Sequence, residues 1–248
     1  MKLKKHLAQG NIIYFHAGEQ QVSVADNFHY RWLSLNGIVQ SVMLNRKPWQ
    51  LTLPHQLAMV LPLQFFTPKN ILELGLGGGA LNRYIKFLIP KSQFTSVELS
   101  REIVACYTQL FNPDNHTLNI INSSADRWLE AQCALDFDWI VMDIFLSIED
   151  SVISFHMIDN LLYKNQNQSL ITLNLPNENE QKIEVLLKKL KLFPNIHVVY
   201  FNVPHYKNIV LHIIPITLMS EFNNKKTASI APYKVKRWQY FWQQGIHL

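Results

Sequence analysis

The amino-acid sequence predicts an α/β fold in which a mostly parallel seven-stranded sheet carries helices on both faces, with a small β-meander in front of it. Three observations predict this fold class. From residue 70 onward, short apolar runs of strand type alternate with helical patterns. Four of the 8 glycines gather between residues 75 and 79, where a strand pattern gives way to a helical one. Short strand patterns fill residues 11–50. Alternation of strands and helices indicates a parallel sheet that is covered on both sides.

The first part of the chain, residues 1–50, is expected to form the meander. Its strand patterns lie at 12–15, 21–25, 30–35 and 39–44. Asn36-Gly37 separates the last two. This pair is typical of a two-residue hairpin turn, because both of its positions need a positive φ. We expect residues 51–217 to form the main domain and residues 218–248 a basic, aromatic tail whose path the sequence leaves open.

The main domain begins with a helical pattern over residues 54–66. Strands are expected at 71–74, 94–98, 118–122, 139–143, 170–175, 197–202 and 208–214. The helices between them are expected at 80–88, 101–110, 125–132, 151–163 and 178–193. The last two strands follow each other closely, which predicts one antiparallel strand at the edge of the sheet.

The composition is that of a globular protein with a large core. The 248 residues are 48% hydrophobic with a formal net charge of +5, and no apolar run reaches membrane-spanning length. The lysines near both chain ends are more typical of solvated ends than of a nucleic-acid surface, so neither nucleic acid nor a membrane is expected as a partner. Two cysteines cannot form a disulfide framework. We expect Cys106 and Cys133 to be buried thiols in a cytoplasmic protein, and no metal site.

The glycine cluster follows a strand and precedes a helix, as in Rossmann-like nucleotide-binding folds. Two interpretations are open. Residues 75–80 fit G-x-G-x-x-A, the dinucleotide pattern. Glu73, Gly75, Gly77 and Gly79 fit E-x-G-x-G-x-G, the pattern of S-adenosylmethionine binding. In the second interpretation the Glu73 carboxylate orients the loop or faces the amino group of the ligand.

Acidic residues end three successive strands of the predicted sheet. Ligands of such folds lie at the carboxyl ends of the strands. Glu98 lies 23 positions after Gly75 and is placed to accept both hydroxyl groups of a ribose. Asp126 is placed to accept an adenine amino group, and Asp143 lies beside the reactive end of the cofactor. The order of these three carboxylates favours a nucleoside site over chance, and it favours the S-adenosylmethionine pattern over the dinucleotide pattern.

Further motifs surround these residues. They are Arg31 to Ser41, Val97-Glu98-Leu99, Ala125-Asp126-Arg127-Trp128-Leu129, Phe137 to Asp143, and Arg83 after the loop. Across roughly residues 30–175 the chain resembles the spermidine synthase-like branch of the class I S-adenosylmethionine-dependent fold. That resemblance implies a transferase that binds S-adenosylmethionine or its decarboxylated form, takes a small-molecule amine as acceptor and is commonly a homodimer. It also implies that Asp143 removes a proton from the attacking amine. Gln40 and His55 are expected on the acceptor side.

The chain departs from that family at several places, two of which concern acidic residues. Gly78 stands where an acid usually grips the amine of the donor, and Leu146 stands where a second aspartate follows the catalytic one. These losses slightly favour methyl transfer to an unidentified small amine. A polyamine aminopropyltransferase and a nucleoside-binding homologue without catalysis are the alternatives.

Overall fold

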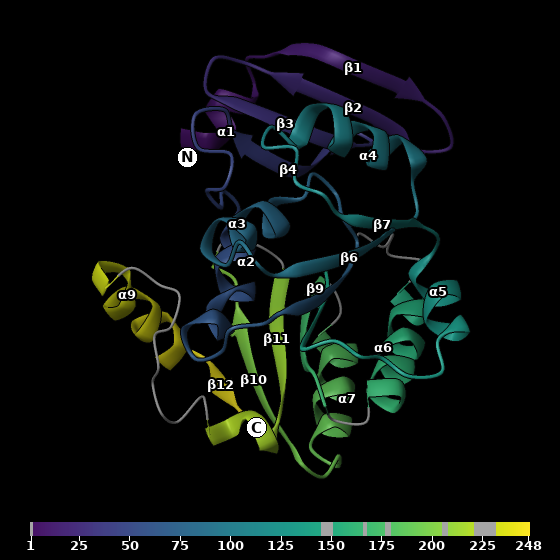
Figure 1. Ribbon diagram of the computed structural model, residues 1–248, viewed down its shortest axis with the longest axis vertical. Helices are drawn as coiled ribbons and strands as arrows, with labels where there is room; N and C mark the ends of the chain where they lie inside the picture. Colours follow the sequence, from purple (N-terminus) through teal and green to yellow (C-terminus); the bar gives the residue numbers. More distant parts are fainter. Residues whose placement is uncertain (1, 145–150, 166–167, 177–179, 205–207, 221–231) are drawn as a thin grey trace.

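The computed structural model describes residues 2–144, 151–165, 168–176, 180–204, 208–220 and 232–248. Its strands form two sheets (Figure 1). One has four strands and lies near the N-terminus, and the other has eight strands and forms the centre of the remaining chain. Leu146 and the first two residues of the helix expected at 178–193 lie outside the described residues.

The N-terminal sheet is the predicted meander. Its order is β1-β2-β3-β4, and each strand is antiparallel to the next. The strands are β1 (Asn11–Ala17), β2 (Gln21–Asp26), β3 (Tyr30–Leu35) and β4 (Ile38–Leu44), after the short helix α1 (Lys2–Leu7). Asn36 and Gly37 have φ of 48° and 77°, as the expected hairpin turn requires.

The large sheet contains the seven strands that the sequence predicts, plus a two-residue eighth. Its order is β12-β10-β11-β9-β8-β5-β6-β7. The strands are β5 (Asn70–Leu74), β6 (Gln93–Glu98), β7 (Asn119–Asn122), β8 (Trp139–Met142), β9 (Leu170–Pro176), β10 (Ile196–Asn202), β11 (Asn208–Pro215) and β12 (Ile246–His247). The five strands from β9 to β7 are parallel to one another.

The expected place of the antiparallel strand is wrong. β11 pairs with β9 on one side and with β10 on the other, both antiparallel, so it lies inside the sheet. β11 is buried from Ile209 onward, whereas β10 has exposed or half-buried positions along its length. The more apolar strand of the hairpin takes the inner place because it has more surface to remove from water.

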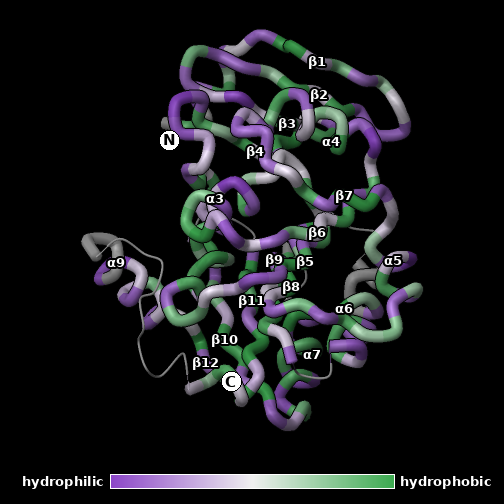
Figure 2. Tube along the Cα trace, viewed as in Figure 1, coloured by the Kyte–Doolittle hydropathy of each residue, from purple (hydrophilic) through white to green (hydrophobic). Residues whose placement is uncertain are grey.

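Helices cover both faces of the large sheet (Figure 1). They are α2 (Pro54–Met59), α3 (Ala80–Leu88), α4 (Arg101–Cys106), α5 (Ala125–Ala131), α6 (Ser151–Asn165), α7 (Glu180–Leu190) and α9 (Pro232–Gln243). One core joins α2, α3 and α9 to the sheet, and a second joins α5, α6 and α7 to its other face. Figure 2 shows hydrophobic residues along the central strands and along α6 and α7.

Three short segments adopt 3₁₀ or π-helical geometry. The pattern at 54–66 gives α2 and then the 3₁₀ turn η1 (Leu61–Gln64), because Pro62 has no N–H to continue a helix. The helix expected at 101–110 ends as the π-helical segment η2 (Tyr107–Phe111), and the 3₁₀ turn η4 (Ile216–Leu218) follows β11. Cys106 is buried as expected, but Cys133 lies beyond the end of α5 and is exposed.

A third core connects the two sheets. Apolar residues of β2, β3 and β4 pack against α4 and η2, and Leu76 of the glycine loop belongs to the same core. The N-terminal sheet therefore lies directly against the elements that surround the loop. Within the described ranges, no helix has both the length and the apolar character that crossing a bilayer requires.

Candidate functional site

The glycine loop, residues 75–79, connects β5 to α3 in a backbone conformation that side chains would obstruct. Gly75, Gly77 and Gly79 have φ of 91°, 51° and 64°. A Cβ atom on Gly75 would lie 2.3 Å from the Asp143 carbonyl oxygen, and one on Gly79 would lie 2.3 Å from Tyr107 Cε2. Glycine is required at both positions because the φ is positive and no space is left. The first glycine brings the end of β8 against the loop.

The backbone amides of the loop already have acceptors within the protein. Leu76 and Gly77 donate to Glu98 Oε2 at 3.1 and 3.3 Å. Gly78 donates to Ser41 Oγ at 2.9 Å, and Gly79 donates to the Leu76 carbonyl at 2.8 Å. The loop is therefore fixed from two sides, by a carboxylate of β6 and by a hydroxyl of the N-terminal sheet.

Glu98 accepts hydrogen bonds from several N–H groups at once. Besides the two loop amides, it accepts from the Ser100 amide through Oε1 at 3.0 Å. A carboxylate offers about four acceptor positions, so these three donors leave one position on Oε1 unused. Glu98 thus combines a structural role in the loop with the capacity for the ribose role predicted from the sequence.

Glu73 lies beneath the loop in β5 and is 2% exposed. Ser96 Oγ donates to its Oε2 at 2.7 Å and Asn82 Nδ2 does so at 3.5 Å. Burial raises the pKa of Glu73 to about 8; the Asp143 and Glu98 charges add to the rise, and the two hydrogen bonds oppose it. A buried carboxyl of this kind holds a proton near neutral pH unless a cation binds beside it.

Arg83 of α3 ties the loop to distant segments. Its Nε donates to the Pro48 carbonyl at 2.8 Å, and its Nη1 donates to the Phe111 carbonyl at 2.7 Å and to the Gly78 carbonyl. Burial lowers the pKa of Arg83 to about 10. The guanidinium is thus engaged with three backbone carbonyls and holds the loop, the end of η2 and the segment after β4 together.

Asp143 follows β8 at the same edge of the sheet. Its backbone N–H donates to the Leu74 carbonyl at 2.9 Å. Its Oδ1 accepts from Asn174 Nδ2 at 2.7 Å, and Asn174 Oδ1 in turn accepts from Asn208 Nδ2 at 3.1 Å. The Asp143 side chain is therefore anchored to the two strands next in the sheet order.

His55 lies in α2, a helix that contacts β9 and β11. Burial lowers the pKa of His55, and the nearby Asp143 charge opposes that shift. Its Nδ1 is buried and has no hydrogen-bond partner among the described residues. The predicted acceptor-side histidine is thus close enough to Asp143 to feel its charge.

Two expected residues have no hydrogen bond to this group within the described part of the chain. Asp126 is in the first turn of α5, whose N-cap is Ser124, and burial raises its pKa with help from Glu130. Gln40 Nε2 donates to the Ile38 carbonyl of its own hairpin at 3.4 Å. No contact recorded among the described residues joins either of them to Asp143, so their roles stay predictions.

Several residues of the site were not singled out as ligand-binding or catalytic from the sequence. They are Ser41, Asn82, Ser96, Asn174 and Asn208. For the four residues other than Asn82, which lies in α3, the available signal was a polar residue within an apolar strand, as in Leu173-Asn174-Leu175, or at the start of one. Such residues are worth noting because a buried polar side chain needs a partner.

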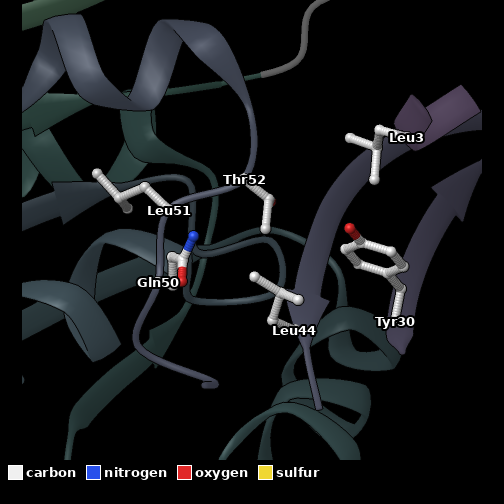
Figure 3. A pocket seen from close by; sticks show the side chains of 6 residues that line it. All are labelled: Leu3, Tyr30, Leu44, Gln50, Leu51 and Thr52. Atoms are coloured by element: carbon white, nitrogen blue, oxygen red, sulfur yellow. The ribbon is translucent and has the colours of Figure 1, made fainter. Parts of the chain in front are cut away.

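No group of three or more metal-ligating side chains occurs in the described part of the chain. A small pocket elsewhere lies between α1, the N-terminal sheet and the segment before α2 (Figure 3). It is lined by Leu3, Tyr30, Leu44, Gln50, Leu51 and Thr52. None of these is an expected site residue, so the pocket is separate from the glycine loop.

No protein-family model matches the chain. The sequence is 32% identical over 98 residues to polyamine aminopropyltransferases of Neisseria meningitidis, from a serogroup A and a serogroup B strain. The match covers 38% of this chain and 37% of each relative, so the chain matches these curated relatives over little more than a third of their length.

Solved structures resemble this one over most of its length. A probable spermidine synthase from Corynebacterium glutamicum has a TM-score of 0.68 at 18% identity and covers 92% of this chain and 94% of its own. A spermidine synthase in complex with the transition state analogue AdoDATO has 0.62 at 13%, covering 92% and 79%. Human methyltransferase-like protein 13 in complex with SAH has 0.56 at 17%, covering 77% and 91%.

The chain therefore has the fold shared by spermidine synthases and S-adenosylmethionine-dependent methyltransferases. The resemblance to spermidine synthases stated from its motifs is confirmed by the curated relatives and by these structural neighbours.

Proposed function

We propose that this protein transfers an aminopropyl group from decarboxylated S-adenosylmethionine to a small amine. The observation that carries the proposal is the arrangement around the glycine loop. Carboxyl groups of Glu73, Glu98 and Asp143 gather at the strand ends, while the loop amides that would bind an anion are occupied. Such a site suits a donor that carries positive charge and no carboxylate.

The donor would lie along the loop with the contacts predicted from the sequence. Glu98 would accept the ribose hydroxyls through its open position, and Asp126 would face the adenine. Gly75, Gly77 and Gly79 would give the loop the tight turn on which the nucleoside lies, because each has a positive φ that other residues rarely adopt. Charged hydrogen bonds of this kind contribute about 1.5–3 kcal/mol each.

The occupied amides favour the decarboxylated donor over the intact one. Intact S-adenosylmethionine has a carboxylate that needs N–H donors or a cation. Leu76, Gly77, Gly78 and Gly79 all donate within the protein, and the Arg83 guanidinium is engaged with carbonyls. The amine of a donor without a carboxylate would instead need only an acceptor such as the Asp143 carboxylate.

Asp143 would serve as the base. An ammonium ion has no lone pair, so the acceptor must lose a proton before it attacks. The amine nitrogen then bonds to the aminopropyl carbon next to sulfur, the carbon–sulfur bond breaks and its electron pair returns to sulfur. The proton goes to the free oxygen of Asp143. Because the sulfonium is already activated, alignment is the main contribution of the protein.

Methyl transfer from intact S-adenosylmethionine is the second candidate. The likeness to a human methyltransferase-like protein solved with SAH supports it, since the same fold holds that ligand. A nucleoside-binding homologue without catalysis would bind the donor at the same glycine loop but would show no turnover.

A binding panel separates these candidates. We expect decarboxylated S-adenosylmethionine and methylthioadenosine to raise the melting temperature more than S-adenosylmethionine, S-adenosylhomocysteine or NAD. Incubation with the decarboxylated donor and a mixture of small amines should release methylthioadenosine, and Asp143→Asn should abolish that release while donor binding survives. A response to S-adenosylhomocysteine alone would favour methyl transfer, and one to NAD alone would refute the proposal.

A further inference from the structure

Two asparagines connect Asp143 to the neighbouring strands in a single direction. Asn208 Nδ2 donates to Asn174 Oδ1 at 3.1 Å, and Asn174 Nδ2 donates to Asp143 Oδ1 at 2.7 Å. A carboxylate only accepts hydrogen bonds. The Asn174 amide must therefore turn its NH₂ group toward Asp143, and its carbonyl then needs a donor on the other side.

Sheet topology explains why a residue 34 positions away supplies that donor. β8, β9 and β11 are successive strands in the sheet order, and β11 runs antiparallel to β9. The start of β11 therefore lies beside the end of β9, with Asn208 opposite Pro176 and Val210 opposite Asn174. Asp143 follows β8, so the three polar side chains form a row across the catalytic edge.

We infer that Asn174 and Asn208 are positioning residues that hold the Asp143 carboxylate ready for the acceptor amine. Asn174 occupies Oδ1 and so leaves Oδ2 to face the amine. Asn208 fixes which end of the Asn174 amide points at the carboxylate. This inference rests on the proposed function in taking Asp143 as the base, but the hydrogen-bond direction itself does not depend on any activity.

Substitutions at Asn208 give a ranking that only this relay predicts. Asn208→Ser keeps a donor and should retain most activity. Asn208→Ala removes the donor. Asn208→Asp keeps the shape of asparagine but can only accept, so the Asn174 amide turns round and presents its carbonyl to Asp143. We expect wild type above Ser, Ser above Ala and Ala above Asp, with kcat reduced about 10- to 100-fold in the last and KM for the donor little changed.

The control places the same charge on the next strand. Asn202 is exposed at the end of β10, beside β11. Asn202→Asp should leave kcat unchanged. If the kcat of Asn208→Asp instead equalled or exceeded that of Asn208→Ala, the shape of the side chain would matter more than the direction of its hydrogen bond. The relay would then be wrong.

A second measurement needs no turnover. In protein with ¹⁵N-labelled asparagine, the Asn174 side-chain amide signal should move strongly in Asn208→Asp and in Asp143→Ala, but not in Asn202→Asp. Absence of turnover in the wild type would refute the proposed function and leave this measurement valid. An unmoved Asn174 signal would refute the relay whether or not the enzyme is active.

Discussion

Glu73 and Glu98 show how surroundings separate two residues with the same side chain. Glu98 accepts hydrogen bonds from three backbone N–H groups. Glu73 is buried with only two side-chain donors, and burial raises its pKa to about 8. When no ligand is bound, Glu73 is therefore neutral near pH 7. A cation bound beside it would favour release of its proton.

Glu73 makes stability depend on pH. Its folded pKa of about 8 lies above the ordinary value of 4.5, so the folded state binds more protons between the two. Stability is fully present below about pH 4.5 and is lost as the pH rises through about 8. We expect wild type to lose about 3 kcal/mol of unfolding free energy between pH 5.5 and 8.5, and Glu73→Gln to lose much less. Urea unfolding at both pH values measures this.

The control for that experiment is Glu19→Gln, because Glu19 is exposed in the turn between β1 and β2. This variant should lose stability as the wild type does. Equal pH dependence in wild type and Glu73→Gln would show that the Glu73 carboxyl is ionised throughout.

Removal of the Glu98 carboxylate should weaken donor binding. Glu98→Ala leaves the Leu76 and Gly77 amides without their acceptor and removes the ribose contact, so we expect binding of methylthioadenosine to weaken by about 1–3 kcal/mol. Isothermal calorimetry measures it, with Glu19→Ala, in the exposed turn between β1 and β2, as the charge-matched control. Unchanged binding in Glu98→Ala would exclude the ribose role.

At the scale of elements, a buried hydrogen-bond chain fixes α2 over the sheet. Trp139 Nε1 donates to Thr172 Oγ1 at 2.9 Å, Thr172 Oγ1 lies 2.9 Å from His212 Nδ1, and His212 Nε2 lies 3.1 Å from the Ala58 carbonyl. Each group is satisfied when neutral His212 carries its proton on Nε2. These hydrogen bonds thereby set the position of α2, the helix that carries His55.

Acid should weaken this attachment. Burial lowers the pKa of His212 to about 3, below the ordinary 6.5. The unfolded state therefore binds more protons between these values, and stability present above about pH 6.5 is lost as the pH falls toward 3. As the pH falls from 7 to 5, the lowered pKa of His212 reduces the free energy of unfolding by about 2 kcal/mol.

His212→Gln should remove that pH dependence. We expect the variant to be less stable at pH 7 and to lose about 2 kcal/mol less than wild type on going to pH 5, measured by urea unfolding. His156→Gln, at an exposed position of α6, is the control. Parallel losses in His212→Gln and wild type would show that His212 already carries a charge in the folded protein.

At the scale of the whole molecule, the tail is part of the core. Trp238 of α9 is 3% exposed and stacks on Tyr84 of α3 with ring centroids 6.4 Å apart. Trp242 packs against Phe65 and Phe201 at 5.1 and 5.6 Å. The tail then adds β12 to the edge of the sheet (Figure 1). Trp238 and Trp242 thus pack the tail onto the rest of the fold.

Trp238→Ala should therefore destabilise the entire fold. We expect a loss of about 3–5 kcal/mol, seen as a single unfolding transition at a lower temperature. Tyr240 is 60% exposed on the same helix, and Tyr240→Ala should change stability by less than about 0.5 kcal/mol. A separate early transition in Trp238→Ala would mean that α9 is detached easily from an otherwise stable domain.

The sequence by itself determined the local structure and the position of the glycine loop. The hairpin at Asn36-Gly37, the strand–glycine–helix turn and the seven strands of the large sheet follow from backbone preferences and apolar periodicity, which act over a few residues. Glu98 and Asp143 were predicted as site residues because they lie where strands end at one shared edge of the sheet.

Only the tertiary structure decided the rest, because the contacts concerned join residues far apart in the chain. The inner place of β11, the position of α9, the partners of Arg83 and the row from Asp143 to Asn208 all depend on which strands become neighbours. A sequence pattern carries the side-chain types but not those pairings, and burial and hydrogen bonding select the pairings when the whole chain packs.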